Sequence, residues 1–303
     1  MKVFIAGTAS RKWILYESLF GRWKPQEPNP FRDASKRERE RERERDGDAA
    51  GVADENISCR RSSVEGGQDR LYDDVYKNKL PYILESFYYA DADTERLIPY
   101  MGDFLLDSGA FTFIQNTKKK VDWNEYLERY ADFIRRNNVE KFFELDIDSV
   151  VGYDKVKELR TKLERETGRQ CMPVWHRNRG IAEYRKLCDE YPYIAIGGIA
   201  IKEIKKTEYP AFKKMIKEAH ERNCKVHGLG FTQISELSKY HFDSVDSSAW
   251  TAGNQFGYVY IFTGRTFKKI HAPEGSRLIK PKEVALHNFK EWIKFQQYAD
   301  KHL

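Results

Sequence analysis

The chain has 303 residues, is 40% hydrophobic and 14% aromatic, and carries a formal net charge of +6, which fits one large domain or two small ones with a sizeable core. No apolar run is long enough to span a membrane, and the first residues form too short an apolar run for a signal peptide. None of the four cysteines is spaced as CxxC. We therefore expect a cytoplasmic protein without a membrane partner, a zinc ribbon or a redox motif.

The first part of the chain predicts a strand over 2–7 and a helix over 11–23. Prolines and then almost purely charged residues follow, with basic and acidic side chains in balance. This charged stretch has no apolar stripe that could dock a helix. We therefore expect a disordered, charged insertion over 30–70 within a single domain that covers 1–303.

Strand and helix patterns alternate from residue 80 onward. The expected strands are short and apolar throughout, at 80–90, 103–109, 141–148, 171–176, 193–200, 224–231, 242–250 and 258–264. The expected helices begin near Asp122 and otherwise lie at 153–167, 181–190, 208–222, 233–240 and 281–300. Continuously apolar strands are typical of a parallel sheet covered by helices. The pattern predicts an α/β fold, a (β/α)8 TIM-like barrel, with an open doubly wound sheet as the alternative.

Polar residues and glycines stand where these strands end. They are Asp107, Asp146, Asp148, His176, Gly197, Gly198, the segment 227–230 and Asp246. In a barrel the carboxyl ends of all strands open on one face, so these residues would meet there. Taken singly, each acid could be a cap or turn residue, His176 a core histidine, and the glycine pair a packing device. Four carboxylates and a histidine at one opening are costly unless they bind something.

Three chemistries fit this set of residues. Asp146, Asp148, His176 and Asp246 have the ligand types of a divalent metal site, as in a metal-dependent TIM-barrel lyase or hydrolase. The glycine turns could offer backbone N–H groups to an anion. A pair of carboxylates could also perform double displacement at a glycosidic carbon, with one as nucleophile and one as acid and base.

Five motifs follow one another along this pattern, between about residues 100 and 250. They are DSGAF at 107–111, LDID at 145–148, AIGGIA at 195–200, HGLGF at 227–231 and SVDSSAW at 244–250. In this order they resemble the tRNA-guanine transglycosylase (queuine tRNA-ribosyltransferase) superfamily. The closest likeness is to its short viral and bacterial branch, which inserts 7-deazaguanines into DNA. The resemblance covers roughly half of the chain.

The resemblance implies a role for each matching residue. Asp246 matches the nucleophile that attacks C1′ of the target nucleoside, and Asp107 matches the general acid and base for the departing and arriving bases. Asp146, with Asp148 as the alternative, matches the acid that recognises the purine edge. The other residues implied in substrate binding are Ser108, Gly109, His176, Gly197, Gly198, Ile199 and Gly230.

The implied activity is that of a glycosyltransferase, specifically a pentosyltransferase. It would exchange guanine in DNA for a 7-deazaguanine base, such as the 7-cyano form, through a covalent aspartyl-nucleotide, with no metal and no cofactor. The family's tRNA enzymes bind zinc through cysteines after the nucleophile, whereas no cysteine follows Cys224 here, so we expect no zinc and favour DNA. A phage origin would place it in the host cytoplasm. The same exchange on tRNA and a non-enzymatic binding subunit remain alternatives.

Lysines in the second half of the chain are expected to contact the phosphates of the nucleic acid. They are Lys202, Lys205, Lys206, Lys213, Lys214, Lys268, Lys269, Lys280 and Lys282. Each of them could equally be a solvated side chain on a helix face.

Overall fold

The computed structural model describes residues 1–8, 11–20, 81–109, 112, 121–273 and 280–303, and the insertion expected over 30–70 lies outside them. The strands are β1 (Lys2–Ile5), β2 (Tyr82–Ser86), β3 (Asp103–Asp107), β4 (Lys141–Phe142), β5 (Val174–Trp175), β6 (Tyr193–Ile196), β7 (Lys225–Gly228), β8 (Ser244–Ser247), β9 (Tyr258–Phe262) and β10 (Phe267–His271). The α-helices are α1 (Lys12–Phe20), α4 (Ala92–Leu97), α6 (Trp123–Arg136), α7 (Asp148–Val151), α8 (Tyr153–Thr167), α9 (Gly180–Glu190), α10 (Pro210–Glu221), α11 (Leu237–Tyr240), α12 (Ala252–Phe256) and α13 (Pro281–His302).

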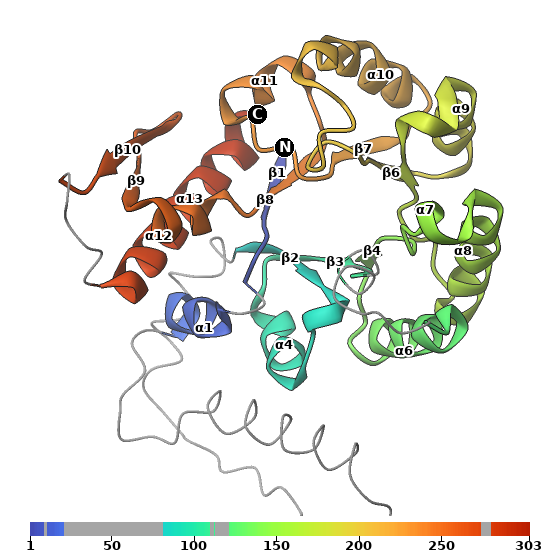
Figure 1. The fold of residues 1–303 in the computed structure, drawn as a ribbon, viewed down its shortest axis with the longest axis horizontal. Helices are drawn as coiled ribbons and strands as arrows, with labels where there is room; N and C mark the ends of the chain where they lie inside the picture. The colour runs from blue at the N-terminus through green and yellow to red at the C-terminus, as the bar shows by residue number, and fades with distance from the viewer. Residues whose placement is uncertain (9–10, 21–80, 110–111, 113–120, 274–279) are drawn as a thin grey trace, which may run out of the picture. The chain divides into compact units, whose positions relative to one another are not determined.

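Strands β1 to β8 form one parallel sheet in the order β4-β3-β2-β1-β8-β7-β6-β5. The two ends of this order meet at a parallel bridge between Phe143 and Met172. The amide of Glu144 donates to the Met172 carbonyl at 3.1 Å, just beyond β4. Strands that follow one another in the chain therefore pair all the way round, and helices surround them (Figure 1). The predicted (β/α)8 TIM-like barrel is confirmed.

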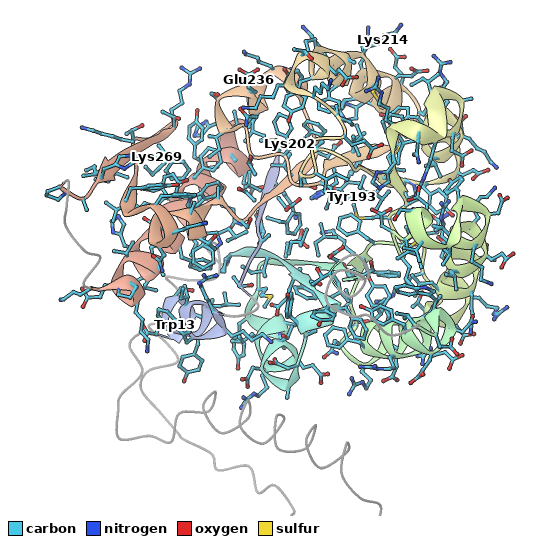
Figure 2. The ribbon with its side chains drawn as sticks, viewed as in Figure 1. Trp13, Tyr193, Lys202, Lys214, Glu236 and Lys269 are labelled. Carbon is cyan, nitrogen blue, oxygen red and sulfur yellow. The ribbon has the colours of Figure 1, made fainter. Side chains whose placement is uncertain are left out.

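Alternate residues of each strand point into the barrel. The interior cluster consists of Phe4, Ala6, Leu84, Leu105, Phe143, Met172, Val174 and Ala195, with Tyr82, Tyr193 and Leu229 packed against it. Figure 2 shows Tyr193 inside the ring of strands and Lys214 outside that ring, on helix α10. Asp107 lies two residues beyond Leu105, and Asp246 is the register partner of Phe4. The strand period therefore places both acids on the interior face.

Two strands are shorter than the sequence predicts. The strand expected over 141–148 pairs only over β4, and the strand expected over 171–176 pairs only over β5. The Glu144 side chain is the reason, because its Oε1 accepts the hydrogen bond of the Val174 amide at 2.9 Å. The Glu144 side chain thus takes the place of a main-chain hydrogen bond between the two strands. The segment after β4 can therefore leave the sheet and turn into α7.

The strand expected over 258–264 is β9, and it lies outside the barrel. It pairs antiparallel with β10 in a separate two-stranded sheet that packs on α13. The rings of Tyr260 and Phe267 lie 5.9 and 5.0 Å from the ring of Trp292 on that helix. An aromatic hairpin that buries one face against a helix resembles a core strand in sequence, which explains the difference.

None of the helices within the described ranges combines the length and the apolar character needed to cross a bilayer.

Candidate active site

Asp246, at the carboxyl end of β8, is held by the Gly230 amide and the His227 imidazole. The amide of Gly230 donates to its Oδ1 at 2.5 Å, and Nε2 of His227 lies 3.2 Å from the same oxygen. Gly230 has a φ of +71°, and a Cβ there would stand 2.7 Å from the Cβ of Ala200, so this position requires glycine. The loop after β7 is thus shaped to bring one amide onto one carboxylate oxygen.

Asp107, at the carboxyl end of β3, is electrostatically coupled to the acids of two other strands. Its Oδ2 accepts a hydrogen bond from the Gly109 amide at 3.2 Å. Burial, and then the charges of Asp146 and Asp246, raise the pKa of Asp107 from 3.8 to about 7, against the lowering effect of the Gly109 amide. The predicted convergence of Asp107, Asp146 and Asp246 at one end of the barrel is therefore present.

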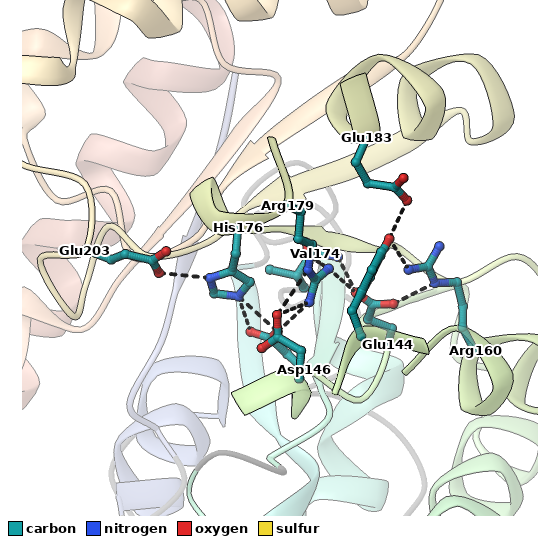
Figure 3. A network of polar contacts seen from close by, with 10 residues as sticks. Glu144, Asp146, Arg160, Val174, His176, Arg179, Glu183 and Glu203 are labelled. Carbon is teal, nitrogen blue, oxygen red and sulfur yellow. Dashed lines mark hydrogen bonds and ion pairs between the residues drawn. The ribbon is translucent and has the colours of Figure 1, made fainter. Parts of the chain in front are cut away.

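His176 bridges two carboxylates from separate segments (Figure 3). Its Nε2 lies 2.9 and 2.8 Å from the two carboxylate oxygens of Asp146, and its Nδ1 lies 3.2 Å from Oε2 of Glu203. Burial lowers the pKa of His176, but its hydrogen bond with Asp146, the Asp146 charge and the hydrogen bond with Glu203 outweigh burial and raise the pKa from 6.5 to about 9. His176 is therefore a cation at neutral pH.

The glycine pair after β6 makes room for this histidine. A Cβ on Gly197 would stand 2.7 Å from Cε1 of His176, and a Cβ on Gly198 would stand 2.7 Å from Oε2 of Glu203. Both glycines therefore permit close packing of the His176 side chain and its partner. The backbone N–H groups expected to bind substrate are those of Gly198 and Ile199.

Arg179 is a site residue that the sequence did not reveal. Its guanidinium lies 3.0 Å from Asp148, 3.2 Å from Glu144 and 3.6 Å from Asp146, and its side chain is 2% exposed. Asp146 and Asp148 therefore both contact this arginine, although Asp148 begins helix α7 and does not continue a strand; Figure 3 shows Asp146 beside Arg179. The only signal in the sequence was a third acid, Glu144, in the same strand pattern.

Glu144 is fully buried between two arginines. Besides Arg179 it contacts Arg160 of α8, whose Nε donates to Oε2 at 2.6 Å. The network continues outward, because Nη2 of Arg160 donates to the Tyr153 hydroxyl at 3.2 Å and that hydroxyl donates to Glu183 at 2.6 Å (Figure 3). A buried ion pair of this kind fixes the relative positions of its elements more than it adds to stability.

Two of the predicted binding residues are buried beside the site. Ser108 is 1% exposed, and its carbonyl accepts a hydrogen bond from the Tyr126 hydroxyl at 2.6 Å. Ile199 is 5% exposed. His227, expected at the strand end, lies instead in the barrel interior beneath Asp246. Among the residues that the structure describes, no three acidic, histidine or cysteine side chains are grouped as ligands for one metal ion.

No protein-family model matches this chain, and no curated protein matches its sequence. Among solved structures, an aldolase is similar at 13% identity and a TM-score of 0.38, over 58% of this chain and 92% of the aldolase chain. The carboxyl transferase domain of Rhizobium etli pyruvate carboxylase is similar at 12% identity and a TM-score of 0.37, over 72% of this chain and 41% of that one. The same domain with oxalate gives 13% identity and a TM-score of 0.37, over 75% and 39% of the two chains.

The raised pKa of Asp107 predicts a pH-dependent stability. The folded protein binds a proton on Asp107 that the unfolded chain releases at lower pH, so stability falls as pH rises through the window from 3.8 to about 7. Between about pH 5 and about pH 8 the wild-type protein should lose roughly 2–3 kcal/mol more than Asp107→Asn, measured by urea unfolding. The exposed Asp154 supplies the control, since Asp154→Asn should keep the wild-type dependence. Identical pH dependence of the wild type and Asp107→Asn would contradict the raised pKa of Asp107.

The high pKa of His176 should depend more on Asp146 than on Glu203, because Asp146 supplies both hydrogen bonding and charge at Nε2. Asp146→Asn should lower the pKa of His176 by more than about one unit, and Glu203→Gln should lower it less. Titration of the imidazole protons by NMR measures both shifts. His220, whose partner is Asp243, serves as the internal reference. A larger effect of Glu203→Gln would show that the order of the two partners is wrong.

Proposed function

We propose that the chain is a guanine transglycosylase, a pentosyltransferase that exchanges guanine in DNA for a 7-deazaguanine base. One observation supports it most. Two carboxylates at one end of the barrel are held differently: Oδ1 of Asp246 is contacted by the Gly230 amide and the His227 imidazole, whereas burial and two neighbouring carboxylates raise the pKa of Asp107 to about 7. Pairs of acids whose environments differ in this way divide into nucleophile and proton carrier.

The proposed reaction uses each acid twice. Asp246 attacks C1′ of the target nucleotide, the bond from C1′ to the guanine nitrogen breaks, and Asp107 gives its proton to the departing base. The incoming base then loses its proton to Asp107 and attacks C1′, which releases Asp246 with net retention at the sugar. A pKa of about 7 suits Asp107 to both steps, because it exchanges protons readily at neutral pH.

The His176 bridge supplies the polar contacts that a purine needs. The carboxylate of Asp146 is the group that accepts hydrogen bonds from the N–H groups of the guanine edge. Its contact with a charged His176 at 2.8 Å holds it in one orientation. Gly198 and Ile199 offer backbone N–H groups to the base carbonyl, next to the same histidine. A small polar binding site on rigid strand ends is what recognition of a flat base requires.

DNA is the proposed polymer substrate, and tRNA is its alternative. Bases inside a duplex are out of reach of a barrel opening, so the target guanine must be flipped or single-stranded. The net charge of +6 suits a polyanionic substrate. Lys268, on the exposed strand β10, is one of the lysines that could contact the phosphates of the nucleic acid. The described cysteines, Cys171, Cys188 and Cys224, are free and buried, which fits the reducing cytoplasm of a host cell.

Labelled 7-cyano-7-deazaguanine, offered with DNA or with tRNA, tests this function. We expect label in DNA, loss of exchange below detection in Asp246→Asn, and a loss of about 10²- to 10⁴-fold in Asp107→Asn, the range for removal of a general acid and base. Asp154→Asn, at an exposed acid on α8, should exchange at the wild-type rate.

Three results would count against the proposal. Label in tRNA alone would replace DNA as the substrate, and wild-type turnover by Asp246→Asn would exclude this residue as the nucleophile. Absence of exchange on both polymers, together with a stoichiometric metal and an activity that a chelator abolishes, would favour a metal-dependent lyase or hydrolase.

A further inference from the structure

A chain of polar side chains crosses the barrel interior beneath Asp246. The Tyr193 hydroxyl of β6 lies 2.5 Å from Oγ of Ser244 on β8, and that oxygen lies 2.5 Å from Nδ1 of His227 on β7. Nε2 of the same imidazole lies 3.2 Å from Oδ1 of Asp246. Ser244 and His227 are fully buried. Neither Tyr193 nor Ser244 has a role in the proposed exchange.

Strand register brings these residues together. His227 pairs with Ala195 of β6 on one side and with Ser244 of β8 on the other, and Tyr193 lies two residues before Ala195. The rings of Phe4 and Phe143 flank the imidazole, with centroids 6.2 and 5.4 Å away. An imidazole between two phenyl rings in a closed core persists only if both of its nitrogens are hydrogen-bonded.

The hydrogen-bonding capacities of these groups favour one direction for their protons, toward Asp246. Burial raises the pKa of Tyr193, so its hydroxyl keeps its proton. Its hydrogen-bond partner among the described residues is Oγ of Ser244. Ser244 then directs its own hydrogen to Nδ1 of His227, which acts as the acceptor. His227 therefore carries its proton on Nε2 and donates it to Oδ1 of Asp246.

We propose that Tyr193, Ser244 and His227 form a positioning relay for Asp246. The relay and the Gly230 amide both hold Oδ1, while Oδ2 accepts no hydrogen bond from any residue in the described part of the chain. Oδ2 is thus the oxygen that attacks C1′. The catalytic consequence rests on the proposed function, whereas the tautomer of His227 does not. Preorganisation of a reacting group by such supporting hydrogen bonds is a general feature of active sites.

The first test measures the tautomer of His227 in the absence of substrate. In protein labelled with ¹⁵N at histidine, the two ring nitrogens of His227 should report the Nε2–H tautomer, assigned by the loss of these signals in His227→Asn. Ser244→Ala and Tyr193→Phe should weaken or mix this tautomer. Tyr82→Phe is the matched control, because the Tyr82 side chain packs against the same interior cluster as Tyr193 but its hydroxyl donates to Asp300. An Nδ1–H tautomer in the wild type, or no change in Ser244→Ala, would overturn the relay.

The second test measures the effect of the relay on the rate of base exchange. Ser244→Ala should lower kcat about tenfold with an unchanged KM, the size expected for one lost hydrogen bond, and Tyr82→Phe should not. If Ser244→Ala fails to fold, Tyr193→Phe carries both measurements, since it removes a single oxygen. An altered tautomer with unchanged kcat would overturn the positioning role. Absence of exchange in the wild type would overturn the proposed function alone, because the tautomer is measured without substrate.

Discussion

The crowding of carboxylates at one end of the barrel is the constraint on which the rest of the site depends. Asp107 of β3, Asp246 of β8 and Asp146, which follows β4, interact through their charges. Each is accommodated differently: burial raises the pKa of Asp107 to about 7, His176 and Arg179 contact Asp146, and N–H donors hold Asp246. Like charges so close together persist only with such separate arrangements.

Two supporting layers keep these arrangements in place. On the helix side, buried Glu144 joins Arg179 to Arg160 and so ties the barrel's closing strands to α8. On the interior side, His227 reaches Asp246 from below. Both layers consist of charged or polar groups, and removal of one partner would leave another buried and unpaired. The acids at the opening are therefore held by residues that no substrate needs to touch.

The strand ends were predictable, because the period of two and the parallel order of short apolar strands determine which residues share a face. Asp107 and Asp246 follow from that rule alone. Arg179 and Glu203 do not, since both lie in connecting segments and reach the site through long side chains whose direction no spacing encodes. His227 was misplaced at the opening for a related reason: its imidazole turns into the core to meet Ser244. The sequence of β9 resembles that of a barrel strand because the buried face of the β9–β10 hairpin is aromatic.

A covalent adduct is the most direct measure of the central claim, that Asp246 is a nucleophile toward a nucleotide. The full chain would be incubated with guanine-containing DNA, denatured, digested and examined by mass spectrometry for a peptide that carries an added nucleotide. The account predicts a denaturation-resistant adduct whose mass is that of the nucleotide without its base, located on Asp246. An adduct on another residue, or exchange of base without any adduct, would contradict it.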